Sequence, residues 1–169
     1  MRLHSAKVPE LALQIVRALT AEGDIECESP KDVQLDVEAV LNQYIRDEQE
    51  VTERAKDLMA SRGLPQTEFA RIRRMVADER QLKLGDEAVD YLLDQLIETL
   101  MYSDHVNEVY AEDVELRRKM REPLRRHAAS EQDLVQEVRA RLKHVQEGTA
   151  VWEVEYRRIM EDIRRRKGL

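Results

Sequence analysis

Residues that break helices are rare in this sequence, and their scarcity constrains the fold more than any other feature. Only five glycines and four prolines occur among 169 residues, against roughly twenty expected from average usage. Between them, apolar residues recur with helical spacing, which indicates amphipathic helices that must bury one face. The sequence therefore predicts a mostly α-helical bundle of about six to seven helices. It excludes collagen, loop-rich disulfide scaffolds and most antiparallel sandwiches.

A single cysteine and the lack of long apolar runs restrict the environment of the chain. Cys27 cannot form an internal disulfide, so a reducing compartment is the default. No stretch of about 18 apolar residues occurs, which argues against a transmembrane helix. Charges at Lys7 and Glu10 interrupt the N-terminal segment, so we expect no signal peptide. These observations predict a cytoplasmic protein that does not enter a membrane.

Helix start and stop signals divide the chain into four segments that we expect to share one composite domain. The strongest start is Ser29-Pro30, where a hydroxyl can cap early amide groups and a residue without an N–H occupies the first helical position. No breaker then appears until Gly63, which predicts a helix of about 32 residues that either bends or leaves the core at the polar run 47–50. The segments are a helix–strand–long-helix unit (1–63), a connecting helix (64–85), a second helix–strand–helix unit (86–129) and a basic C-terminal hairpin or arm (130–169).

Signals in the C-terminal third allow more than one division into helices. Pro123 should kink or end the helix that begins near residue 113. Residues 130–133 resemble a capping box, which would open a new helix. Gly148 and Thr149 either break that helix or only bend it. The sequence thus leaves open whether residues 130–166 form one helix or two.

Two parts of the sequence match when the chain is shifted by 81 positions. Residues 8–35 and 89–116 are identical at seven of 28 positions without a gap, mostly at apolar positions. Amphipathic helices also align partly by composition, but here the register holds through the loop between them. We therefore predict a duplicated helix–strand–helix unit. Because a lone short strand leaves its backbone groups unsatisfied, the strands near 25–28 and 106–109 should pair as a two-stranded ribbon.

No motif points to a catalytic, cofactor or metal site. The four histidines lack the spacing of a metal-binding pair. Five scattered glycines cannot build a phosphate-binding loop, and carboxylate pairs are too numerous to single one out. We expect no enzyme activity, no cofactor and no small-molecule substrate. A helical enzyme with carboxylate chemistry is the third alternative, after the two interaction hypotheses below.

Charge is distributed unevenly along the chain. Residues 1–116 carry 13 basic and 26 acidic residues, whereas residues 117–169 carry 15 basic and 9 acidic ones. Basic residues could neutralise the phosphates of a nucleic acid. The candidates are Arg117, Arg118, Lys119, Arg121, Arg125, Arg126, Arg164, Arg165, Arg166 and Lys167. Alternatively, these residues favour the helix macrodipole, or the basic third of the chain packs on the acidic part.

Trp152, Tyr156 and Ile159 lie on one face of the last predicted helix. Such a stripe is either core packing or an anchor for a partner, since Trp and Tyr are enriched at interface hot spots. We therefore hypothesise a noncatalytic interaction or regulatory protein. It would present long amphipathic helices and a C-terminal arm to protein partners or to a second copy of itself. The alternative is a nucleic-acid-associated protein that uses the basic residues.

Several local signatures are similar to those of a known family. They are the segments 23–26, 36–41, 63–64 and 85–88, and the C-terminal block Gly148-Thr149-x-x-Trp152. Together they resemble a bacterial family catalogued as the domain of unknown function number five hundred and seven. The resemblance covers essentially the whole chain and implies a bacterial, cytoplasmic, mostly helical protein. It supplies no activity and no site residues.

Overall fold

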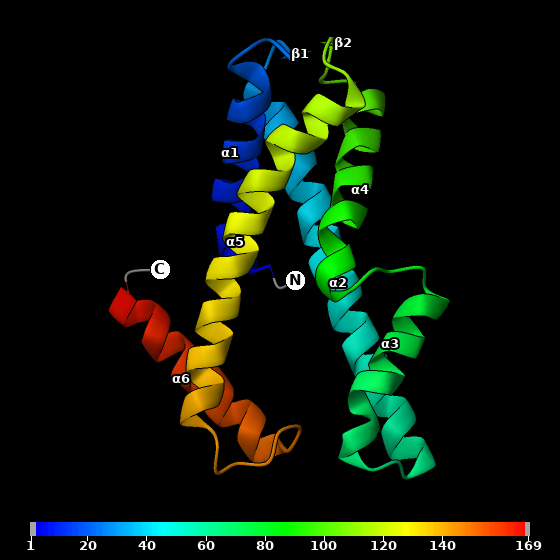
Figure 1. The fold of residues 1–169 in the computed structure, drawn as a ribbon, viewed down its shortest axis with the longest axis vertical. Helices are drawn as coiled ribbons and strands as arrows, with labels where there is room; N and C mark the ends of the chain where they lie inside the picture. The colour runs from blue at the N-terminus through cyan, green and yellow to red at the C-terminus, as the bar shows by residue number, and fades with distance from the viewer. Residues whose placement is uncertain (1–2, 168–169) are drawn as a thin grey trace. The chain divides into compact units, whose positions relative to one another are not determined.

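The computed structural model describes residues 3–167, and these form a mostly helical fold with one small sheet (Figure 1). Six α-helices within the described residues confirm the predicted helical class. In chain order the elements are η1 (Ser5–Lys7), α1 (Val8–Thr20), β1 (Ile25–Glu26), α2 (Pro30–Arg62), η2 (Gln66–Glu68), α3 (Phe69–Glu79), η3 (Gly85–Glu87), α4 (Ala88–Tyr102), β2 (Glu108–Val109), α5 (Asp113–Arg141) and α6 (Ala150–Lys167). They divide into two compact units, residues 1–128 and 129–169, with the boundary inside α5.

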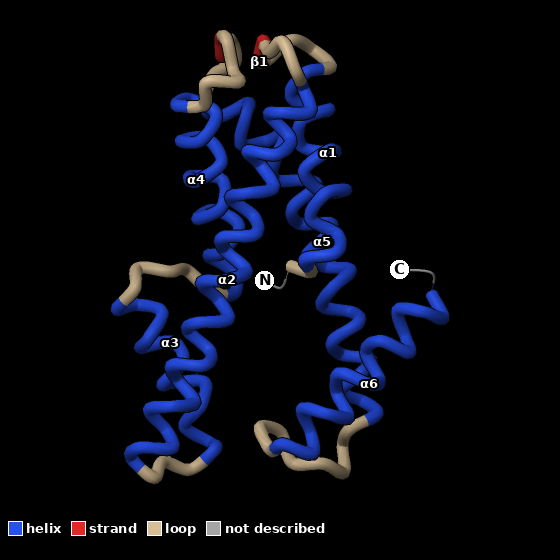
Figure 2. The backbone as a smooth tube through the Cα atoms, turned by 180° about the vertical axis from the view of Figure 1, so that it is seen from behind, coloured by secondary structure: helices blue, strands red, loops and turns tan. Residues whose placement is uncertain are grey.

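In the first unit, buried side chains of α1, α2, α3, α4 and the N-terminal half of α5 form one core; Figure 2 traces the backbones of these helices. Each helix contributes apolar residues at helical spacing, as the periodicity predicts. Side chains with no more than 2% exposure include Leu11, Ile15, Leu19, Leu41, Tyr44, Leu92, Leu93, Leu96, Leu100, Leu116, Met120 and Leu124. α1, α2 and α4 supply most of these side chains.

α2 begins and ends where the sequence predicts. Ser29 Oγ accepts a hydrogen bond from the Asp32 amide at 3.3 Å, and Pro30 is the first helical residue. Gly63 ends the helix with a φ of 60°, a left-handed conformation that glycine adopts without strain. The 33 residues between them form one continuous helix.

The polar run 47–50 is the part of α2 that meets the third helix. α3 lies beside the C-terminal half of α2 in both views (Figures 1 and 2). Arg73 Nη2 donates to Glu48 Oε1 at 2.8 Å, and Arg80 Nη1 donates to Glu50 Oε2 at 2.6 Å. The polar residues that interrupt the apolar stripe thus bind arginines at the α2–α3 contact.

The predicted ribbon is present. β1 pairs with β2 in antiparallel fashion, Ile25 opposite Val109 and Glu26 opposite Glu108. Backbone bonds continue on both sides, from the Asn107 amide to Glu26 O at 2.8 Å and from the Tyr110 amide to Asp24 O at 2.8 Å. Each strand is two residues long, shorter than the expected 25–28 and 106–109.

One expectation about α5 is wrong: the capping-box pattern at 130–133 does not open a new helix, because α5 runs without interruption from Asp113 to Arg141. Of the two outcomes predicted for Pro123, the end of the helix does not occur. Met120 and Leu124 on either side of the proline are fully buried. Their burial offsets the one hydrogen bond that proline removes. Glu131, inside the capping-box pattern, forms an ion pair with Arg164.

The second unit is a helical hairpin made of the end of α5 and α6. Residues 130–166 therefore contain parts of two helices, separated by residues 142–149. Thr149 Oγ1 accepts from the Trp152 amide at 3.2 Å and caps the start of α6. The core of this unit consists of Leu134, Val138, Leu142 and Ile163, with half-buried apolar side chains around them.

Candidate functional site

Lys119 lies at the centre of an ion cluster that holds the β1 turn against α5. Its side chain is 10% exposed, and its Nζ lies 2.5 Å from both Glu22 Oε2 and Asp24 Oδ2. The bonds to Asp24 and Glu22 raise the pKa of Lys119, and the bond from Lys119 lowers the pKa of Glu22. This lysine is therefore committed to the fold and is not presented to a polyanion.

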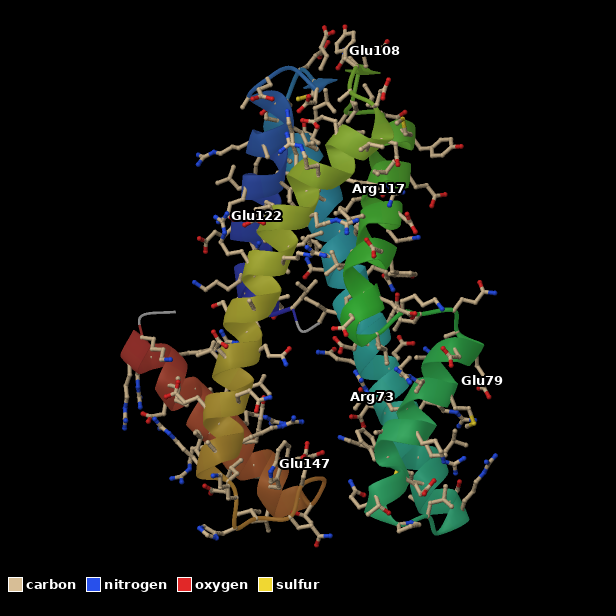
Figure 3. All side chains as sticks on the ribbon, viewed as in Figure 1. Arg73, Glu79, Glu108, Arg117, Glu122 and Glu147 are labelled. Atoms are coloured by element: carbon tan, nitrogen blue, oxygen red, sulfur yellow. The ribbon has the colours of Figure 1, made fainter. Side chains whose placement is uncertain are left out.

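Four of the candidate arginines line one face of α5. Together with Val114 and Glu122, they border a shallow groove of about 430 Å³; they are Arg117, Arg118, Arg121 and Arg125. Arg117 reaches across to α4 and pairs with Asp94 at 2.7 Å (Figure 3). Arg121 pairs with Asp90 of the same helix at 2.6 Å. Two acids of α4 thus neutralise two of the four arginines.

Among the other candidate arginines on α5, two form ion pairs with glutamates one turn away, and one has no ion pair within the described residues. Arg118 pairs with Glu115 at 2.5 Å, and Arg126 pairs with Glu122 at 3.2 Å. Such exposed pairs one turn apart contribute little to stability. Arg125 is exposed and has no ion pair to any residue of the described chain. Arg118, Arg125 and Arg126 are consequently the members of this cluster that a ligand could reach.

The C-terminal basic residues belong to the other unit. Arg164 forms a two-pronged hydrogen bond with Glu131, and both side chains are about nine-tenths buried. Lys167 pairs with Glu137 at 2.7 Å, while Arg165 and Arg166 pair with Asp162. Arg164 is therefore a structural residue of the hairpin.

The two units of the structure differ in their balance of basic and acidic residues, and the boundary between them does not coincide with the charge boundary at residue 117 of the sequence. Residues 1–128 carry 19 basic and 27 acidic residues, and residues 129–169 carry 9 basic and 8 acidic ones. The basic cluster at 117–126 falls inside the acidic unit, where several members bind its carboxylates. The strongly acidic surface is thus confined to the first unit, and the hairpin is close to neutral.

The aromatic stripe of α6 is only partly covered. Trp152 and Tyr156 stack with ring centroids 4.8 Å apart and planes 27° from parallel. Both rings and Ile159 are half-buried against the hairpin core. Val151 and Val154, on the opposite side of the same helix, are each 65% exposed. α6 therefore carries apolar side chains on two faces, of which one faces solvent.

A groove runs between α2 and α4 in the first unit. Its volume is about 310 Å³, and it is lined by Asp36, Ala39, Val40, Gln43, Tyr44, Asp47, Tyr91, Leu92, Gln95 and Thr99. Tyr44 and Tyr91 lie in contact at its centre, with ring centroids 6.0 Å apart. Burial raises the pKa of both tyrosines. Sequence reasoning missed this site, because its residues look like ordinary faces of two amphipathic helices.

At one end of the groove, Asp36 binds a serine and a histidine. Ser103 Oγ donates to Asp36 Oδ2 at 2.5 Å, and His105 Nδ1 lies 2.9 Å from the same oxygen. The carboxylate raises the pKa of His105. In a hydrolytic triad the serine bonds to the histidine, whereas here both groups bond to one carboxylate oxygen. The arrangement orders the loop after α4 and gives Ser103 no histidine base.

Within residues 3–167, no three His, Cys, Asp or Glu side chains are grouped to hold a metal ion. No helix of this described part combines the length and apolar character needed to cross a bilayer.

Comparison with known proteins identifies a family. No similar sequence is found among the curated proteins. A family model covers residues 1–169, the whole chain, and its description is "Protein of unknown function (DUF507)". This match agrees with the local signatures found in the sequence, and the chain belongs to the DUF507 family.

Proposed function

We propose that this chain is a noncatalytic interaction protein that docks through its C-terminal hairpin, residues 129–169, onto the same hairpin of a second copy. The observation that carries the proposal is the composition of α6. Apolar side chains occupy its inner face, and Val151 and Val154 on its outer face are 65% exposed. Neighbouring Trp152 and Tyr156 add half-exposed aromatic surface of the kind found at interface centres.

The size of the hairpin supports the proposal. Within its described residues, 129–167, the hairpin has five buried apolar side chains, four of them in its core cluster, and domains near this size usually need a staple or association to be stable. Two copies packed side by side would form a four-helix arrangement with the exposed valines inside. With nine basic and eight acidic residues, the hairpin carries almost no net charge to oppose self-association.

The test is the oligomeric state of the full chain, measured by sedimentation equilibrium over a concentration series. We expect a dimer for the wild type and a monomer for the double variant Val151→Glu/Val154→Glu. The matched control is Val114→Glu, since Val114 is 75% exposed but lies on the first unit; this variant should remain dimeric. Circular dichroism verifies that all three proteins fold. A monomeric wild type, or a double variant that stays dimeric, would overturn the proposal.

A second candidate function is binding of a nucleic acid along α5. It is favoured by the arginines that line one groove beside Val114, of which Arg118 and Arg125 are the accessible ones. Binding would be dominated by phosphate contacts and would weaken steeply with salt. Duplex binding measured across a salt series, with Arg118→Gln/Arg125→Gln as the variant, tests it. Absence of binding at low salt would reject it.

We also propose a bacterial source, a cytoplasmic location and an internal duplication for this chain. The family resemblance and the single cysteine support a bacterial, cytoplasmic protein, and Cys27 is a free thiol. An ancestral duplication is supported by the repeated order helix–strand–long helix, in α1–β1–α2 and again in α4–β2–α5. If a twofold axis related the two repeat units within one chain, their strands would pair in antiparallel fashion, as β1 and β2 do.

A further inference from the structure

The groove between α2 and α4 combines an apolar floor with an acidic rim. Leu92 and Tyr44 form the floor and are fully or almost fully buried. Asp36 and Asp47 lie at its two ends, and Gln43 and Gln95 add amide groups. No basic side chain belongs to the lining. An occupant must therefore bring apolar side chains for the floor and positive charges for the ends.

The two carboxylates are fixed in place. Asp36 accepts hydrogen bonds from Ser103 and lies against His105. Asp47 Oδ1 accepts from Gln43 Nε2 at 2.7 Å. They are eleven residues apart on one helix, which places them about 16 Å from each other on the same side of α2. Two positive charges with this separation would be matched without rearrangement of the site.

The dimensions select the kind of occupant. A volume of about 310 Å³ is at the lower limit of pockets for whole ligands, and it suits a few side chains better than a cofactor. A groove between two parallel or antiparallel helices commonly accepts the apolar face of a third helix. The first unit as a whole has eight more acidic than basic residues, so it attracts basic segments over a distance.

We propose that the α2–α4 groove is a docking site for a basic amphipathic helix of a partner protein. Leucine-like side chains of that helix fill the space over Tyr44, Tyr91 and Leu92. Lysine or arginine side chains three turns apart pair with Asp36 and Asp47. This site lies on the first unit and is independent of the docking assigned to the C-terminal hairpin.

The probe is a synthetic, fluorescently labelled helical peptide with leucines along one face and two lysines eleven positions apart. Anisotropy titration of the full-length protein measures its affinity, and NMR chemical-shift changes locate it. We expect shifts at Tyr91, Gln95 and Ala39, and weaker binding at higher salt. A peptide with glutamates in place of the lysines should not bind.

Three variants make the test specific. Asp36→Asn/Asp47→Asn should weaken binding about fivefold to tenfold, the effect of losing two exposed charge pairs. Ala39→Phe places a bulky ring at the exposed lip of the groove and should block it. Asp57→Asn, an exposed aspartate further along α2, is the matched control and should bind as the wild type does.

Two results would overturn the inference. One is peptide binding that the double variant and the control weaken equally, since that would show attraction to the acidic unit without a site. The other is an absence of shifts along α2 and α4 at saturation. Neither result bears on the oligomeric state, so failure of this inference is distinguishable from failure of the hairpin proposal.

Discussion

Replacing Tyr44 by phenylalanine removes one hydroxyl from the centre of the first unit. The side chain is 2% exposed, and its Oη donates to the carbonyl oxygen of Lys83 at 3.1 Å. This bond joins α2 to the loop that precedes α4. A buried hydrogen bond of this kind contributes about 1 kcal/mol net. We expect Tyr44→Phe to lower the free energy of unfolding by about 1 kcal/mol at neutral pH.

The same substitution should have the opposite effect at alkaline pH. Burial, with a contribution from Glu48, raises the pKa of Tyr44 in the folded protein, whereas in the unfolded chain it is about 10. The stabilisation is therefore complete below about pH 10 and is lost as the pH rises toward the folded-state pKa. By pH 11 the wild type should lose about 1.4 kcal/mol from this group. Tyr44→Phe has no such group, so it should then match or exceed the wild type in stability.

Urea denaturation followed by far-ultraviolet circular dichroism measures the difference. Tryptophan fluorescence is unsuitable, because Trp152 belongs to the second unit. Tyr102→Phe is the control, since Tyr102 is 82% exposed and its hydroxyl makes no hydrogen bond within the described residues. A stability difference that stays constant from about pH 8 to pH 11 would refute the argument that the phenol is held neutral.

Three further predictions follow from the charged clusters. The pKa of His105 should lie above its ordinary value of about 6.5, because Asp36 stabilises the protonated ring. This interaction stabilises the folded protein below pH 6.5, and the stabilisation is lost as the pH rises through the pKa of His105 in the folded state. An NMR titration measures it, and Asp36→Asn should return the pKa toward 6.5. Lys119→Met should lower the midpoint of thermal unfolding, because two carboxylates lose the cation they share; an unchanged midpoint would contradict this role. Glu131→Gln should cost about 3 kcal/mol by leaving Arg164 buried without its partner. The double variant Glu131→Leu/Arg164→Met should recover most of that loss, as followed by fluorescence of the single tryptophan.

Local chemistry explains why much of the fold could be predicted from the sequence. Ser29, Pro30 and Gly63 act within one turn of the helix they delimit, so α2 follows from those residues alone. The ribbon was predictable because two short strands can satisfy each other's backbone groups. These features depend on neighbours in the sequence or on a repeat within it.

The errors come from residues whose role depends on distant partners. Pro123 lies in a helix that long-range burial of Met120 and Leu124 maintains. Residues 130–133 have the pattern of a capping box, but they lie inside α5, where Glu131 binds Arg164, 33 positions away. Likewise, nothing near Lys119 in the sequence reveals that Glu22 and Asp24 surround it. The sequence therefore does not distinguish the basic residues that bind carboxylates within the fold from those that a ligand could reach.

The α2–α4 groove could not be predicted for a related reason. Tyr44 and Tyr91 are 47 positions apart, and each has the spacing of an ordinary core residue on its own helix. Only packing of the two helices shows that Asp36 and Asp47 flank them. A groove forms where the surfaces of two helices meet. The apolar periodicity of one helix does not indicate which residues of another helix will lie beside it.

The ribbon also has a consequence for the order of folding. Ile25 and Val109 are 84 positions apart, so their pairing closes most of the first unit into a loop. Closing such a long loop costs more conformational entropy than packing two helices that are adjacent in the sequence. The α2–α3 hairpin, by contrast, joins segments close in sequence and can form early. We expect the strands to be among the last elements to assemble and the first to separate. The amide hydrogens of Asn107 and Tyr110 donate to Glu26 O and Asp24 O across the ribbon. They should therefore exchange well before those of α4, and the two strands would meet only when folding is nearly complete.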